Sequence, residues 1–85
     1  MIDVTLLTQP GCASCEHAKT VLDRVGADYP LQVETLDLRS PRGTALARDS
    51  GGWFAPILLV AGTPFSHGRL SERKLRRELD RHLPR

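Results

Sequence analysis

The chain has 85 residues and a formal net charge of +2 at pH 7, which predicts one small domain over residues 1–85. Hydrophobic residues make up 40% and charged residues 26%, values that argue against a disordered chain. Aromatic residues are only 5%, too few for a row of base-stacking side chains, and the longest apolar run, residues 57–61, is far short of the roughly 20 residues that a membrane span needs.

The first half of the chain alternates between strand and helix patterns. Apolar and polar residues alternate over residues 2–8, which predicts a strand. From residue 13 the apolar residues recur at helical spacing, and we expect Gly26 to end this helix as its C′ residue. The apolar positions of that helix are Ala18, Val21, Leu22 and Val25. Residues 31–38 then predict a second strand.

The second half begins with a short helix. Ser40 and Pro41 have the residue types of an N-cap and of the first helical position, so a helix is expected from there to about Asp49. The glycines at residues 51–52 would end it. Residues 57–60 are all apolar, as in a strand that is covered on both faces.

The chain closes with a hairpin and a last helix. Residues 61–63 can turn the chain into a short strand at about residues 64–66, and Ser71 is a plausible cap for the final helix. The apolar stripe of that helix comprises Leu75, Leu79 and Leu83. The order β-α-β-α-β-β-α predicts an α/β fold with a parallel pair of strands at the start and antiparallel strands at the end.

The cysteines of the chain are Cys12 and Cys15. A disulfide stabilises a fold mainly by closing a long loop, and a bond between residues three positions apart closes an almost minimal one. Stabilisation therefore explains this pair poorly. A redox-active dithiol and one half of a zinc site remain as interpretations.

The histidines give the zinc interpretation little support. A structural zinc site needs four ligands, and a catalytic one usually has three from the protein. His17 would point about 200° away from Cys15 on a helix, and neither His67 nor His82 has a recognisable ligand spacing. We therefore expect no metal site.

The cysteines fall where the first strand gives way to the first helix. Cys12 would lie at the helix start, where free backbone N–H groups and the positive end of the helix dipole stabilise a thiolate and lower its pKa. Cys15 precedes Ala18 and Leu22 at helical spacing, so it should face inward. An exposed attacking thiol with a shielded partner suits the capture and release of a mixed disulfide. Two small thiols kept only for packing are the alternative.

A proline stands at the entrance of the apolar strand. Pro56 follows Ala55, and proline cannot donate a hydrogen bond to a strand ladder. It could simply begin the strand, or it could form a cis-proline loop beside the cysteines that offers a backbone edge to a disulfide substrate. Trp53, close by, could face that substrate or cover the core.

These residues together resemble the glutaredoxin-like members of the thioredoxin superfamily. Residues 8–15 match the Thr-x-Pro-x-Cys-x-x-Cys stretch of that family, Pro56 matches its cis-proline, and residues 68–71 lead into the final helix as in the family. The resemblance implies a thioredoxin-like fold with a central four-stranded mixed sheet and three flanking helices.

The resemblance also implies roles for single residues. Cys12 would be the nucleophile and Cys15 the resolving thiol. The substrate would bind at Gly11, Ala55, Pro56 and Gly68.

Several positions depart from the family pattern. Gln9 replaces a lysine that helps to hold glutathione, Phe54-Ala55 replaces the common Thr-Val pair, and residues 67–71 replace the Gly-Gly-x-Asp stretch. Ala-Pro before the strand and the Ser66-x-x-Arg69 pattern are similar to the small redoxins that serve ribonucleotide reductase. The reductant could accordingly be glutathione, another low-molecular-weight thiol, or a flavoprotein such as thioredoxin reductase, and no bound cofactor is expected.

Two functions follow from the sequence. The first is a small cytoplasmic thiol–disulfide oxidoreductase, a monomeric electron carrier that uses its Cys-x-x-Cys dithiol to reduce mixed disulfides or those of a disulfide-containing protein substrate. The second is a non-catalytic binding module that docks a partner through the proline loop and the basic C-terminal helix. Residues 69–85 hold seven basic and three acidic residues, a net +4. We expect these charges mainly to pair on a solvated helix face, so neither nucleic acid nor a membrane is an expected partner.

Overall fold

The computed structural model describes residues 1–51 and 54–83, and its elements follow the predicted order. They are β1 (Ile2–Thr8), α1 (Ala13–Gly26), β2 (Leu31–Asp37), α2 (Pro41–Asp49), β3 (Ile57–Val60), β4 (Thr63–His67) and α3 (Glu72–Asp80). The strand at β4 is longer at both ends than predicted, and β2 ends one residue earlier. Trp53 lies outside the described residues.

The strands form one mixed sheet in the order β2-β1-β3-β4. β1 pairs in parallel with β2, and α1 connects the two, because parallel neighbours need a crossover. β1 pairs with β3, and β3 with β4, in the antiparallel direction. The predicted α/β fold, with its four-stranded mixed sheet and three helices, is confirmed.

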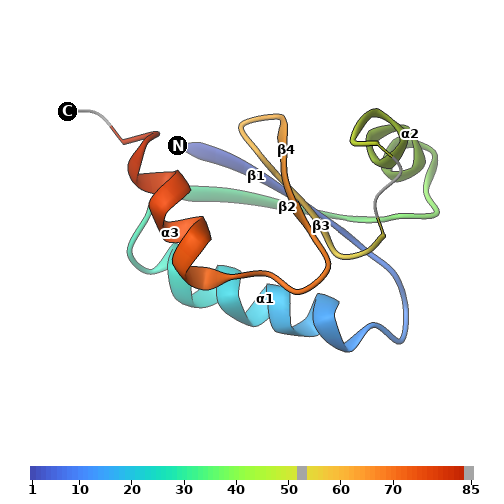
Figure 1. The fold of residues 1–85 in the computed structure, drawn as a ribbon, viewed down its shortest axis with the longest axis horizontal. Coiled ribbons are helices and arrows are strands. Elements are labelled where there is room, and N and C mark those ends of the chain that lie inside the picture. Colours follow the sequence, from blue (N-terminus) through green and yellow to red (C-terminus); the bar gives the residue numbers. More distant parts are fainter. Residues whose placement is uncertain (52–53, 84–85) are drawn as a thin grey trace.

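One face of the sheet is covered by α1 and α3, and α2 lies on the opposite side (Figure 1). The inward residues of β1 meet the apolar stripes of both helices in the larger of two core clusters. Its buried members are Ile2, Val4, Leu6, Ala18, Val21, Leu22, Val25, Leu58, Val60, Leu70, Leu75 and Leu79. Tyr29, Leu31, Phe65 and Leu83 pack against them in partly buried positions.

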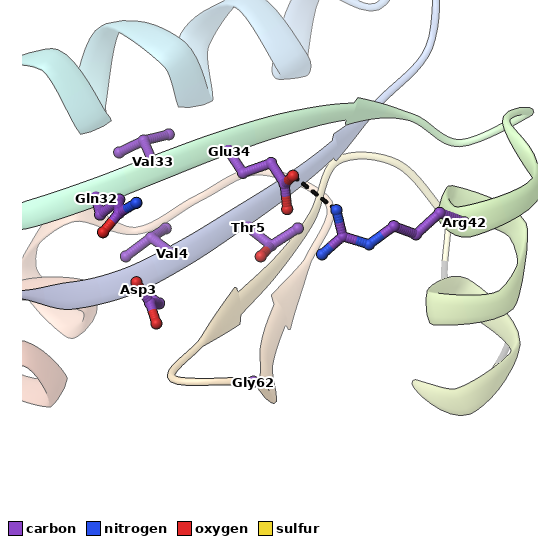
Figure 2. A pocket seen from close by; sticks show the side chains of 8 residues that line it. All are labelled: Asp3, Val4, Thr5, Gln32, Val33, Glu34, Arg42 and Gly62. Atoms are coloured by element: carbon purple, nitrogen blue, oxygen red, sulfur yellow. Dashed lines mark hydrogen bonds and ion pairs between the residues drawn. The ribbon is translucent and has the colours of Figure 1, made fainter.

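The α2 side of the sheet has a smaller core. Leu7, Ile57 and Leu59 are buried there. The partly buried residues Leu36, Leu38, Leu46 and Ala47 pack against them. Beyond α2 this face is polar and hollowed by a pocket of about 360 Å³ (Figure 2), and none of the predicted site residues lines it.

The predicted helix caps are confirmed at α2 and α3. Ser40 accepts a hydrogen bond from the Gly43 N–H, and Pro41 is the first residue of α2. Ser71 accepts a hydrogen bond from the Lys74 N–H. Each serine satisfies a backbone donor that the helix start leaves free.

The predicted role of Gly26 is wrong. Gly26 is the last residue of α1, and the cap residue is Ala27 in a right-handed conformation. The N–H groups of Asp28 and Tyr29 both donate to the Val25 carbonyl, at 2.9 and 3.1 Å. Because these bonds satisfy the end of the helix, no left-handed glycine is needed there.

Candidate redox site

The cysteine pair lies where the chain leaves β1 and enters α1. Cys12 immediately precedes the helix in an extended conformation, and its Sγ accepts a hydrogen bond of 3.1 Å from the Cys15 N–H. Cys12 is therefore the N-cap residue of α1. The two Cα atoms are 5.2 Å apart, and the sulfur atoms are joined in a disulfide. This geometry lets one sulfur lie at the helix dipole while the other stays within bonding reach.

The cysteines differ in exposure. Cys15 is only 2% exposed and belongs to the inward face of α1, whereas Cys12 is partly exposed. The first sulfur that a partner can reach is thus Cys12. The expected inward position of Cys15 is what the structure shows, while the catalytic roles of the pair stay predictions.

Gly11 sets the direction in which the chain enters the helix. Its φ of +67° lies in the left-handed region, where a side chain is strained, and no heavy atom lies within 4 Å of the position that a Cβ would take. The glycine is required by the backbone conformation, not by crowding.

The proline loop lies at the same end of β1 as the cysteines. The peptide bond between Ala55 and Pro56 is cis. In the antiparallel pairing Leu7 faces Ile57, so the preceding residue, Pro56, comes next to the end of β1, where the loop to Cys12 begins. Pro56 is buried and Ala55 is partly exposed.

Gly68 is tied to this loop by its backbone. Its N–H donates a hydrogen bond of 2.9 Å to the Pro56 carbonyl, and its φ is +72°. A Cβ at Gly68 would lie only 3.1 Å from Cε2 of Phe54. A glycine here therefore makes room for the Phe54 ring. The structure brings Ala55, Pro56 and Gly68 together, and their role in substrate binding stays a prediction.

Phe54 is a feature that the sequence interpretation missed. Its side chain is 64% exposed, and its ring meets the His67 ring edge-on, with 4.7 Å between centroids. Sequence reasoning treated Phe54 only as a departure from the family pattern. An aromatic residue two positions before the proline was the available signal, but its contact with Gly68 depends on how β4 returns past the loop.

His17 is not part of the candidate redox site. His17 is partly buried, and its Nδ1 atom has no hydrogen-bond partner within residues 1–51 and 54–83. Over the same residues no three His, Cys, Asp or Glu side chains gather as metal ligands would.

The fold and the site define the class. A Cys-x-x-Cys pair at the start of α1, a cis-proline before β3 and the observed sheet order are the features of the thioredoxin superfamily. A family model matches residues 3–80, and the chain belongs to the glutaredoxin-like domain family (DUF836). A glutaredoxin-like fold with this cysteine pair fits a thiol oxidoreductase.

Solved structures support the fold. A single-substitution mutant of thioredoxin from Halobacterium salinarum NRC-1 is similar with a TM-score of 0.76 and 17% identity, over 99% of this chain and 76% of that one. A structure described as that of a malarial protein is similar with a TM-score of 0.72 and 19% identity, over 99% of both chains. No curated protein matches the sequence. Of the described residues, no helix is both long and apolar enough to cross a membrane.

Proposed function

We propose that this protein is a dithiol–disulfide oxidoreductase that reduces disulfides of proteins or mixed disulfides. The observation that carries the proposal is the asymmetry of the cysteine pair. Cys12 is partly exposed and its sulfur accepts a backbone N–H, while Cys15 is buried 5.2 Å away between Cα atoms. Backbone donors and the helix dipole favour a thiolate at Cys12 in the reduced protein.

The first step is attack on the substrate. The Cys12 thiolate forms a bond to one sulfur of the substrate disulfide, and the bond between the two substrate sulfurs breaks. The departing substrate sulfur leaves as a thiolate and takes a proton from solvent. The product is a mixed disulfide between Cys12 and the substrate. The proline loop lies where it can hold the substrate backbone during this step.

The second step resolves the mixed disulfide. The Cys15 thiol loses its proton, its sulfur attacks Cys12, and the bond between Cys12 and the substrate breaks. The second substrate sulfur leaves as a thiolate and takes up a proton. Two electrons have then moved from the dithiol to the substrate, and the protein holds the Cys12–Cys15 disulfide. Burial of Cys15 keeps outside disulfides from trapping it first.

A donor must return two electrons to the oxidised pair. We propose a low-molecular-weight thiol such as glutathione, or a flavoprotein such as thioredoxin reductase, as that donor. The electrons reside on the two sulfurs, so the cycle needs no cofactor bound to this chain. We also propose that the protein acts as a monomer in the cytoplasm, where such donors keep thiols reduced.

The test offers the oxidised protein either glutathione with its reductase or thioredoxin reductase, and follows NADPH oxidation in the presence of insulin as a disulfide substrate. We expect turnover with one of the two systems, and loss of at least about 99% of it in Cys12→Ser, because the nucleophile is gone. Ser14→Ala, a substitution between the cysteines, is the matched control and should retain activity. Insulin reduction that persists in Cys12→Ser would contradict the proposal.

A further inference from the structure

The acidic residues of α3 each have a partner other than Arg73 and Arg77, the arginines on the solvent side of the helix. Glu72 accepts from Arg24 of α1 at 2.6 Å and from Arg76 at 3.0 Å. Asp80 accepts from the Tyr29 hydroxyl at 2.5 Å. Among the described residues, the ion-pair partners of Glu78 are Arg81 and His82, which follow the helix. None of these three acids forms an ion pair with Arg69, Arg73, Lys74 or Arg77.

Four cations in and before α3 are consequently unpaired. Arg69, Arg73, Lys74 and Arg77 are exposed, and none of them has an ion pair with a residue of ranges 1–51 or 54–83. We expected the charges of residues 69–85 mainly to pair on the helix face, and these four residues have no such pair with a described residue. The physical reason is that Glu72 faces α1, where Arg24 and Arg76 converge on it.

The helix geometry directs these charges away from the core. Leu75 and Leu79 are fully buried and mark the inward side of α3. At 100° per residue, Arg73 and Arg77 lie on the opposite side of the helix, one turn apart. Lys74 lies on a flank between the two sides. We call Arg69, Arg73, Lys74 and Arg77 the cationic face.

The cationic face is joined to the redox site through Gly68. Arg69 follows Gly68 directly, and Gly68 donates its N–H to the Pro56 carbonyl. The ring of Phe54 covers Gly68 from the solvent side. A protein that brings a disulfide to Cys12 along the proline loop therefore arrives beside the start of the cationic face.

We infer that the cationic face docks an acidic surface of the protein that exchanges electrons with the Cys12–Cys15 pair. The inference rests on the proposed function and names the chemistry of its partner. Charges at exposed positions act mainly on the rate of encounter, and they reach about 10 Å at 0.1 M salt. A nucleic acid partner is disfavoured because four cations on a chain of net charge +2 neutralise few phosphates.

The experiment measures second-order rate constants for the reduction of three synthetic peptides by the dithiol form. The peptides share one disulfide loop and differ only in flanking residues, which are glutamates, lysines or serines. Arg77→Glu reverses one charge of the cationic face, and Arg48→Glu is the matched control. Arg48 is likewise exposed, unpaired within the described residues and in the last turn of its helix, but on the other side of the sheet.

At low salt we expect the glutamate peptide to react about tenfold faster than the lysine peptide, as electrostatic steering allows. Arg77→Glu should reduce this preference about threefold, Arg48→Glu should leave it unchanged, and about 0.5 M salt should remove most of it. Equal rates for the three peptides, or equal effects of the two substitutions, would overturn the inference.

Two further measurements distinguish failure of the docking inference from failure of the proposed function. Hydroxyethyl disulfide, small and neutral, should react equally with the wild-type protein and both variants. If it reacts while the peptides show no preference, only the docking inference is wrong; if no disulfide is reduced at all, the proposed function is wrong and the docking falls with it. Tight binding of a short DNA duplex that Arg77→Glu abolishes, with no peptide preference, would assign the face to nucleic acid and overturn the inference.

Discussion

The two faces of the sheet differ in how they are held together. On the α1 and α3 side, twelve buried residues form one cluster that joins both helices to β1 and β3. On the α2 side the apolar cluster of the described residues has three buried members, and a polar pocket lies beside it (Figure 2). In that pocket Arg42 reaches back from α2 to pair with Glu34 of β2 at 2.7 Å.

The better-packed face of the sheet is the one that carries the cysteine pair. Cys12 is the N-cap residue of α1, so the position of its sulfur depends on how firmly α1 packs on the sheet. Cys15 lies on the same buried side of that helix. The well-packed face therefore carries the cysteine pair, while α2 and its polar surroundings hold no part of it. Changes on the two faces should separate stability from activity.

The largest stability effect is expected from the α1 and α3 face. Leu75 is 0% exposed, and Leu75→Ala should lower the free energy of unfolding by about 3 kcal/mol, through lost burial and the cavity left behind. Leu46→Ala on the α2 face removes the same atoms from a partly buried position, so about 1 kcal/mol is expected. Urea unfolding of both variants measures the difference. Equal losses would show that the two faces are equally packed.

A smaller effect concerns backbone clearance on the α2 side. A Cβ at Gly43 would collide with the Asp37 carbonyl oxygen, so Gly43→Ala should destabilise the protein by about 2 kcal/mol. In α1, a Cβ at Gly26 would meet only the Leu31 Cδ1 atom at 3.9 Å, an ordinary contact. Gly26→Ala should therefore be neutral or stabilising by about 0.5 kcal/mol. Thermal unfolding of the pair tests this, and a stabilising Gly43→Ala would contradict it.

The smallest expected effect is on how the stability changes with pH in acid. It involves two carboxylates, Asp37 beside α2 and Glu72 on α3. Hydrogen bonds from the Arg39 side chain and N–H lower the pKa of Asp37 from 3.8 to about 2. Hydrogen bonds from Arg24 and Arg76 likewise lower the pKa of Glu72 below its usual 4.5. Because the unfolded chain binds these protons first, both carboxylates stabilise the fold above about pH 5, and that stability is lost as the pH falls towards 2.

Substitution of these two acids tests the pH dependence. Asp37→Asn and Glu72→Gln should each make the urea midpoint less sensitive to pH between about 5 and 2, because each removes one group that takes up a proton on unfolding. Both are surface pairs, so the change should be modest. An unchanged slope in Glu72→Gln would show that its pairs with Arg24 and Arg76 do not persist in solution.

Hydrophobic periodicity predicted β1, α1, β3 and α3, because each of them buries residues at the spacing of its own secondary structure. It predicted the inward position of Cys15 for the same reason. The helix α2 buries only Gly43, and it was the types of its cap residues, Ser40 and Pro41, that predicted it. The end of α1 was mistaken since Gly26 looked like a stop signal, whereas Asp28 and Tyr29 satisfy the helix end through their backbone. Local residue types cannot reveal such a choice.

Two other features that the sequence did not predict depend on segments far apart in the chain. Glu72 could have paired with Arg73 on its own helix, but α1 brings Arg24 against it from 48 residues away. Phe54 rests on Gly68 because β4 runs back past the proline loop. Both contacts are set by packing of the whole fold. They decide which charges are paired and which aromatic ring stays exposed.

The sulfur of Cys12 also stabilises the first turn of α1, because it accepts a hydrogen bond from the Cys15 N–H. A sulfur lone pair is available to that N–H whether the atom is a thiolate, part of a mixed disulfide or part of the internal disulfide. The N-cap hydrogen bond of α1 can thus persist in each state of the proposed redox cycle. Cys12→Ser would retain the N-cap hydrogen bond without the reactivity. Cys12→Ala would remove both and cost about 1 kcal/mol of helix stability. Loss of chemistry and loss of local order can therefore be told apart at a single residue.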